Sequence, residues 1–201
     1  MTVTLIIAIV STLLQLAGYA IYNRSVWTGR VRPNLSSWLI WGGISLLNTA
    51  SYFSLSRHDF VVSLMPFTVT AVNVLTLFVI LRKGTFQRIG RVDAAALAIS
   101  AIAVLLWQLA GSSLANLMVQ IAIIVGTVPT IVGVWRDPSV ERPLPWLLWS
   151  LSFIIAIVVV TMRHVSWVAY ASPVIQMVMY IGIGLLALRA QRPPLADMRR
   201  A

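Results

Sequence analysis

One segment of the chain carries aromatic and polar side chains at helical spacing. Its members are Trp38, Trp41, Ser45, Asn48 and Tyr52. Steps of three and four residues place all five on one face of a helix. Aromatic rings suit the flat apolar faces of sugars and nucleoside bases, and the amide and hydroxyls can hydrogen-bond to such solutes. A polar stripe of this kind is unfavourable toward lipid, so we expect it to face inward and to bind a neutral polar solute.

The same pattern returns 108 residues later, without most of its polar groups. The second stripe is Trp146, Trp149, Phe153, Ala156 and Val160. Gly18 and Gly126, and Trp27 and Trp135, are separated by the same 108 residues. Residues of the same type at one constant offset indicate an internal repeat, and such a repeat determines the architecture of the fold. An alternative for Trp38 and Trp146 is a place in the aromatic belt at a membrane interface.

Polar groups in two further apolar runs extend the candidate site. Asn73 and Tyr180 are separated by 107 residues, and Gln176 lies one turn before Tyr180. Side-chain amides in a lipid-embedded helix need partners, which a solute or a neighbouring helix can provide. The predicted substrate-binding residues are therefore Trp41, Asn48, Asn73, Trp149, Gln176 and Tyr180. The alternative is hydrogen bonding between helices with no ligand.

Three prolines fall within apolar runs and are candidate hinges. They are Pro66, Pro129 and Pro173, of which the first and last are separated by 107 residues. Proline removes a backbone hydrogen bond and bends a helix. Interrupted helices line the paths of many transporters. These bends could serve as gates or be static kinks.

The composition is that of a membrane protein. The chain of 201 residues is 59% hydrophobic and only 10% charged, whereas soluble domains carry about 25% charged residues. Seven apolar runs are long enough to span a bilayer as helices of about 17–25 residues. They are Val3–Tyr22, Leu35–Leu55, Phe60–Leu81, Ala94–Ala110, Leu114–Trp135, Leu144–Met162 and Val165–Leu188.

The basic residues between these runs predict an orientation. Of the 15 Lys and Arg residues, all but Arg57 and Arg163 fall in alternate connections and in the C-terminal tail. The positive-inside rule then places the N-terminus outside and the C-terminus in the cytoplasm, with an odd number of spans. Membrane orientation explains the net charge of +10 better than nucleic-acid binding does, because the arginines lie between apolar runs.

Repeat and orientation together give an all-α polytopic membrane protein. We predict two parallel repeats of three transmembrane helices, residues 1–91 and 113–191. A linker helix at 92–112 joins them, and a short cytoplasmic tail follows at 192–201. The linker must cross the membrane an odd number of times, because both repeats start on the same side.

The motif around the fifth run adds a family resemblance. Its parts are Gly126–Thr130, Trp135–Asp137, Glu141 and Trp146–Trp149, a helix with a proline, a short basic turn and a second apolar helix. With the 3+1+3 plan, the chain resembles the SWEET sugar transporters and the wider PQ-loop superfamily. The Trp-x-x-Trp pairs are also similar to those of the PnuC vitamin transporters. The resemblance implies alternating access between two three-helix bundles, and substrate binding by an Asn on the third helix, here Asn73.

Several other classes of function are disfavoured. No charged residue lies in the middle of an apolar run, which favours uncoupled movement of a neutral solute. We see no acid–base pair, nucleophile set or phosphate loop, so an enzyme is not expected, and neither is a cofactor. The chain has no Cys, and His58 and His164 have no companion ligands for a metal.

The leading prediction is a uniporter-like transporter of a sugar or nucleoside, embedded in a lipid bilayer. The alternative from another class is a membrane sensor or partner protein that never opens to both sides. The excess of Arg over Lys points to a bacterial cytoplasmic (inner) membrane. The sequence leaves open whether the chain forms homo-oligomers.

Overall fold

The computed structural model describes residues 2–109 and 112–191, which fold almost entirely into helices. The α-helices of this part are α1 (Thr2–Trp27), α2 (Leu35–Leu55), α3 (Phe60–Lys83), α4 (Arg91–Trp107), α5 (Ser112–Arg136), α6 (Pro143–Met162) and α7 (Ala171–Leu188). Short 3-10 helices add η1 (Pro138–Val140), η2 (Trp167–Tyr170) and η3 (Arg189–Gln191). The predicted all-α class and the seven helices are confirmed.

The helix bounds differ from the prediction mainly at two places. Helix α1 continues past Tyr22 to Trp27. Helix α7 begins at Ala171 rather than Val165, because the chain first forms η2, which places Pro173 in the first turn of α7. Proline is tolerated in a first turn, where its missing N–H would have no helical partner. The predicted tail, 192–201, and the end of the fourth run at Ala110 lie outside the described residues.

Five segments of the described chain are long and apolar enough to cross a membrane. They are Thr2–Trp27, Phe60–Lys83, Ser113–Arg136, Pro143–Met162 and Trp167–Leu188. Helix α2 falls outside this set because it carries polar side chains such as Ser45, Asn48 and Thr49, all of which are buried. Helix α4 has 17 residues, the lower end of the spanning length.

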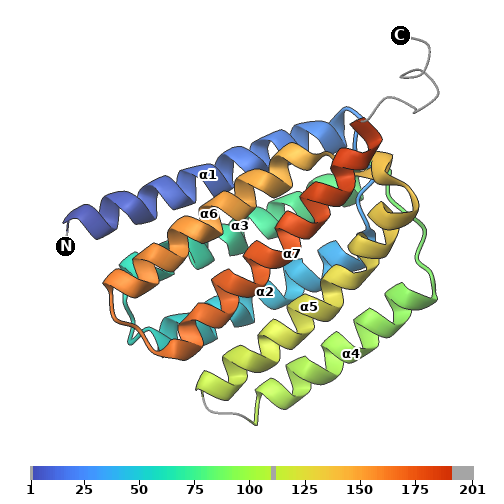
Figure 1. The fold of residues 1–201 in the computed structure, drawn as a ribbon. Helices are drawn as coiled ribbons and strands as arrows, with labels where there is room; N and C mark the ends of the chain where they lie inside the picture. The colour runs from blue at the N-terminus through green and yellow to red at the C-terminus, as the bar shows by residue number, and fades with distance from the viewer. Residues whose placement is uncertain (1, 110–111, 192–201) are drawn as a thin grey trace.

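For description, α1, α2 and α3 are called the first group and α5, α6 and α7 the second group, and α4 lies at one edge of the bundle (Figure 1). In the first group α3 packs against both α1 and α2, and in the second α7 packs against both α5 and α6. Across the middle, α1 pairs with α6 and α2 pairs with α5. Helix α4 packs on α5 and, less extensively, on α2.

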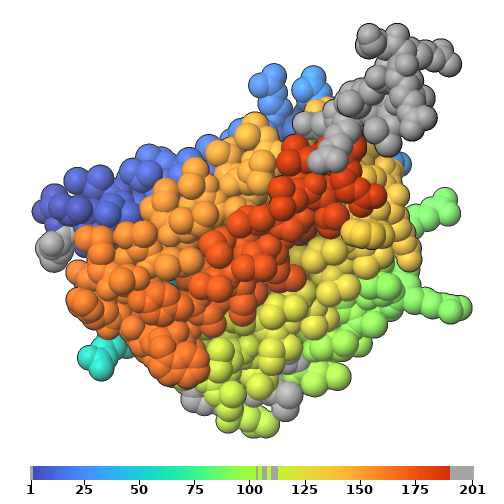
Figure 2. Space-filling model, in the orientation of Figure 1, coloured from blue at the N-terminus to red at the C-terminus, as the bar shows by residue number. Residues whose placement is uncertain are grey.

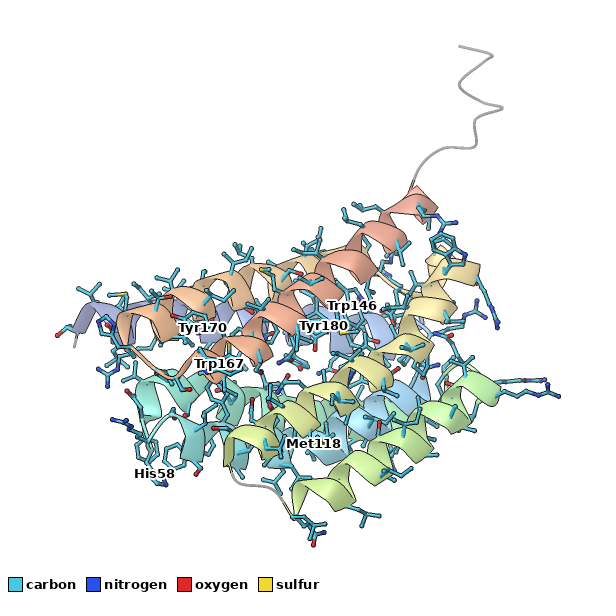
Figure 3. All side chains as sticks on the ribbon, turned by 60° about the horizontal axis from the view of Figure 1, so that its bottom comes forward. His58, Met118, Trp146, Trp167, Tyr170 and Tyr180 are labelled. Carbon is cyan, nitrogen blue, oxygen red and sulfur yellow. The ribbon has the colours of Figure 1, made fainter. Side chains whose placement is uncertain are left out.

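Successive helices run in opposite directions, so the bundle has two distinct ends. The arginine end holds the α1–α2, α3–α4 and α5–α6 connections and the end of α7, with Arg32, Arg88 and Arg136 among its residues. The histidine end holds the α2–α3 and α6–α7 connections, with His58 and His164. Figure 3 labels His58 at that end.

The exterior of the described chain is apolar, and its interior holds polar as well as apolar side chains. Large apolar residues such as Leu46, Phe78 and Leu105 are more than 60% exposed, whereas many serines, threonines and amides are buried. On the face drawn in Figure 2, α5, α6 and α7 form one continuous surface. An apolar exterior with polar groups inside is compatible with a membrane protein.

Two glycines allow the helix pairs across the middle to approach closely. A Cβ at Gly18 on α1 would overlap the indole of Trp149 on α6. A Cβ at Gly126 on α5 would overlap the side chain of Ile40 on α2. Small residues at such crossings bring helix backbones together where packing drives association.

We therefore expect Gly18→Ala to destabilise the protein by about 1–3 kcal/mol, because the added methyl overpacks the α1–α6 contact. Gly43→Ala is the matched control, since a Cβ at Gly43 in α2 meets nothing within 4 Å. Thermal unfolding in detergent compares the two variants. Equal midpoints for both would contradict the close approach.

Candidate functional site

A small cavity lies between the two groups of helices, toward the histidine end. It is lined by residues of α1, α2, α3, α6 and α7, among them Asn48, Tyr52, Met65, Val69, Phe153 and Gln176. The volume open to the centre of a water molecule is about 30 Å³, room for one or two waters. A sugar or nucleoside would need the helices to move apart.

Two of the predicted substrate-binding residues line this cavity. Asn48 accepts a hydrogen bond at Oδ1 from Nε2 of Gln120 on α5, at 2.9 Å. Gln176 donates from Nε2 to Oγ of Ser172, at 2.9 Å. These bonds hold each amide by one atom, and the described residues offer no hydrogen-bond partner to Nδ2 of Asn48 or Oε1 of Gln176. Each of these two lining residues therefore keeps a polar atom that could bond to a polar solute.

An aromatic layer separates the cavity from the arginine end. Its members are Tyr19, Tyr22, Trp38, Trp41, Trp146, Trp149, Phe153 and Tyr180, all of them buried. Most neighbouring rings meet edge to face or tilted, for example Trp146 and Trp149 at 5.0 Å and Trp38 and Trp41 at 5.2 Å between centroids. Figure 3 shows Trp146 and Tyr180 close together, from α6 and α7. Phe153 also lines the cavity, so the two features are continuous.

Three predicted site residues, Trp41, Trp149 and Tyr180, belong to this layer and do not line the cavity. The indole of Trp149 donates to the carbonyl oxygen of Gln15, at 3.3 Å. Among the described residues, the buried indole nitrogen of Trp41 has no hydrogen-bond partner. An indole N–H that the protein leaves unpaired could bind a solute that reaches this depth.

Asn73 lies behind the layer rather than in the cavity. Its Oδ1 accepts a hydrogen bond from the hydroxyl of Tyr19 at 2.5 Å, which ties α3 to α1. Asn73 and Tyr180 are both less than 10% exposed, so neither faces outward. In this state, the amide of Asn73, which was predicted to contact a solute, instead holds the hydroxyl of Tyr19.

The sequence prediction gave no role to Glu141 beyond its place in a motif. This side chain is 2% exposed, in the connection between η1 and α6. Its Oε1 accepts from the hydroxyl of Tyr22 at 3.0 Å, and its Oε2 accepts from Nε1 of Trp146 at 3.1 Å. One signal was available in the sequence, because Glu141 is the only glutamate in the chain.

An ion pair joins the two groups of helices at each end. At the histidine end, Arg163 after α6 binds Asp59, with its Nε 2.7 Å from Oδ2; Asp59 also caps the N-terminus of α3. At the arginine end, Nη2 of Arg32 lies 3.2 Å from Oδ2 of Asp137. The first pair is partly buried, and the second is about half exposed.

The three candidate hinges lie in different settings. Pro66 is inside α3 and lines the cavity, and Pro129 is inside α5, beside a polar cleft at the arginine end. Pro173 also lines the cavity, but it begins α7 instead of interrupting it. A bend in the middle of a helix is therefore possible at Pro66 and Pro129, whereas Pro173 lies in the first turn of α7, after η2.

The histidines have no counterpart ligands around them. Within the described residues, no group of three His, Asp or Glu side chains could hold a metal ion. His58 and His164 are exposed and have positive φ angles of 62° and 49°. They form similar turns after α2 and α6.

Comparisons with protein-family models, curated proteins and solved structures give no match to this chain. The resemblance to SWEET and PQ-loop transporters therefore stays a prediction from the sequence. Any functional assignment depends on the cavity, the aromatic layer and the groups that close the two ends.

The Tyr19–Asn73 hydrogen bond gives a stability prediction. Asn73→Leu should cost about 1–3 kcal/mol, because it leaves the buried hydroxyl of Tyr19 without its acceptor. Adding Tyr19→Phe removes that hydroxyl and should recover most of the loss. Unfolding midpoints of the single and double variants test this, and a double variant no more stable than Asn73→Leu would argue against the bond.

Proposed function

We propose that this chain is a seven-span membrane transporter that moves a neutral polar solute, such as a sugar or nucleoside, by alternating access. The observation that carries the proposal is the composition of the cavity wall. Five pairs of positions related by the sequence repeat line it together: Met65 and Ser172, Pro66 and Pro173, and Val69 and Gln176 at an offset of 107, with Asn48 and Ala156, and Tyr52 and Val160, at 108. A cavity on the axis between two repeats is where transporters of this architecture bind substrate.

The helix contacts support two like-oriented repeats. Exchanging α1 with α5, α2 with α6 and α3 with α7 turns the α1–α6 contact into the α5–α2 contact, and every major contact among these six helices has its counterpart. The close approaches at Gly18 and Gly126 follow the same exchange. Helix α4 has no counterpart under this exchange, as expected for a linker between two repeats.

A pair of cation–aromatic contacts follows the same symmetry. Nζ of Lys83, at the end of α3, lies 5.7 Å from the ring centroid of Trp27 on α1. The guanidinium carbon of Arg189, just after α7, lies 5.0 Å from the ring centroid of Trp135 on α5. Both tryptophans are more than half exposed, which suits interfacial anchors.

Charge supports the orientation that the sequence predicts. With the arginine end in the cytoplasm of a bacterial cell, the inner membrane surrounds the apolar exterior and the histidine end faces outward. In this arrangement the aromatic layer is the cytoplasmic gate, and the Arg163–Asp59 pair lies at the outer end. On this proposal, the packed aromatic layer corresponds to a closed cytoplasmic gate.

Transport then follows from separating the two groups of helices at one end at a time. A solute in the cavity would bond to Asn48 and Gln176, and opening of the aromatic layer would offer it the faces of Trp41 and Trp149. Tyr180 lies beside both indoles, at 6.4 and 5.8 Å between centroids. The resemblance to SWEET transporters, stated from sequence motifs, is consistent with this cycle.

The first test is uptake by purified protein in liposomes, over a panel of sugars, nucleosides and amino acids. For a transported solute, Asn48→Ala and Gln176→Ala should each lower kcat/KM about 5- to 10-fold, the value of one lost hydrogen bond. Ser100→Ala is the control, because Ser100 bonds to the carbonyl oxygen of Ala122 between α4 and α5, away from the cavity. Absence of uptake for every solute would count against a transporter.

The second test separates a transporter from a sensor. The chain has no cysteine, so Val69→Cys places a single thiol in the cavity wall. We expect an impermeant maleimide to label it from either side of the membrane, and solute to slow the labelling. Labelling from one side only would favour a sensor, and Thr76→Cys, at a fully buried position on the same helix, is the unlabelled control.

A further inference from the structure

Glu141 is a buried carboxyl group that bonds to two side chains of the aromatic layer, the proposed cytoplasmic gate. Its two oxygens bind to α1 through Tyr22 and to α6 through Trp146. The hydroxyl oxygen of Tyr22 in turn accepts a hydrogen bond from Nε1 of Trp38 on α2, at 3.1 Å. One carboxyl group thus links three helices, two from the first group and one from the second.

Every donor in this network is neutral. Within the described part of the chain, no Lys, Arg or His nitrogen lies within 4.0 Å of the carboxyl oxygens. A buried carboxylate normally has a cationic partner, because transfer of an unpaired charge out of water is very costly. Glu141 lacks one, so its buried form is better tolerated as the neutral acid.

The charged groups around Glu141 are engaged elsewhere or exposed. Arg32, from the α1–α2 connection, pairs with Asp137. The hydroxyl and backbone N–H of Ser139 hold the pKa of Asp137 below its usual range, so Asp137 stays ionised and keeps Arg32. Arg142, next to Glu141, and Arg136, at the end of α5, are exposed, and Arg189 lies over the ring of Trp135.

Burial raises the pKa of Glu141 to about 8, although the hydrogen bonds from Trp146 and Tyr22 act in the opposite direction. This group lies in the α5–α6 connection, outside the apolar spans. At neutral pH the closed arrangement therefore holds a proton that the same side chain would lose in water, where a glutamic acid has a pKa of about 4.3.

We propose that Glu141 is a proton-binding site of the cytoplasmic gate: the closed gate keeps the carboxyl protonated, and opening the gate releases that proton to water at the arginine end. The gate itself rests on the proposed function, whereas the proton site rests on the described geometry alone. A neutral acid satisfies the indole and hydroxyl donors without an unpaired charge, and hydration on opening allows the carboxylate to form.

The direction of the pH effect follows from linkage. Between the two pKa values the closed state binds a proton that the open state does not, so a lower pH favours the closed gate. Raising the pH from 6 to 8 should increase the ratio of open to closed gate about 50-fold, after allowance for titration of the closed form near 8. Above this range the ratio should level off.

Infrared spectroscopy tests the proton site directly. Purified protein should show a protonated-carboxyl band that disappears as the pH rises, with a midpoint near pH 8. The band should be missing from the spectrum of Glu141→Gln. Tyr22→Phe keeps the carboxyl but removes a donor that favours the charged form, so its midpoint should move upward. A midpoint of 4–5 for the band that Glu141→Gln removes would overturn the proposal. If Glu141→Gln does not fold, an unmoved midpoint in Tyr22→Phe would overturn it equally.

Sided thiol labelling tests the link to the gate. The vesicles have the arginine end outward, and the maleimide is added outside. The labelling rate of Val69→Cys is divided by that of Thr28→Cys, an exposed position at the arginine end. This ratio removes the intrinsic pH dependence of thiol labelling. We expect the ratio to rise about 50-fold from pH 6 to 8, and to stay low at both in Glu141→Gln. The same rise in Glu141→Gln would exclude Glu141 as the linked group. If the thiol of Val69→Cys is not labelled from the arginine end at any pH, the gate is refuted, and alternating access with it. The infrared midpoint then still decides whether Glu141 binds a proton.

Discussion

The structure depends on pairing polar groups inside a protein whose exterior is apolar. Water does not reach a hydroxyl or amide at this depth. Some hydroxyls, such as those of Thr12 and Thr127, bond to a carbonyl oxygen of their own helix, and other polar groups bond across to a second helix. Asn48 finds Gln120 between α2 and α5, and Tyr19 finds Asn73 between α1 and α3. Thr49 bonds to Thr70 at 2.7 Å between α2 and α3. These bonds fix which helices are neighbours, a choice that apolar contact with lipid cannot make.

The two halves share spacing but not chemistry. Position 48 carries an amide where its counterpart, Ala156, carries a methyl group, and the counterpart of Val69 is the more polar Gln176. Glu141 would correspond to Pro33 at an offset of 108, so the carboxyl group of the gate belongs to the second half alone. In the proposed repeat, duplication would provide the axis and the cavity, and the departures from it would place the polar groups that a solute or a proton can use. An asymmetric site can bind a solute in a single orientation.

Sequence reasoning reached the helices and the buried stripe, because both depend on local spacing. Helix α2 has the predicted bounds, and its five stripe residues are all buried. The partners of those residues could not be predicted, since Gln120 and Tyr22, which bond to Asn48 and Trp38, lie on helices whose rotation is set by packing. Glu141 was missed for a related reason: a charged residue in a short connection between helices is normally solvated. Here Tyr22 and Trp146, which are distant from each other in the chain, enclose it.

In the proposed transport cycle, the aromatic layer would link the energy of solute binding to the energy of opening. Trp41 and Trp149 now contact other rings of the layer, and an aromatic pair contributes about 0.5–1.5 kcal/mol beyond the burial of its surface. Opening the layer without a solute would lose several such contacts and expose indoles to water. A flat solute that stacks on Trp41 or Trp149 replaces part of that loss, and so it lowers the cost of opening. A solute with no apolar face offers no such replacement, and the layer should stay closed around it. The closed cavity would then select substrates by their faces as well as by their hydrogen bonds.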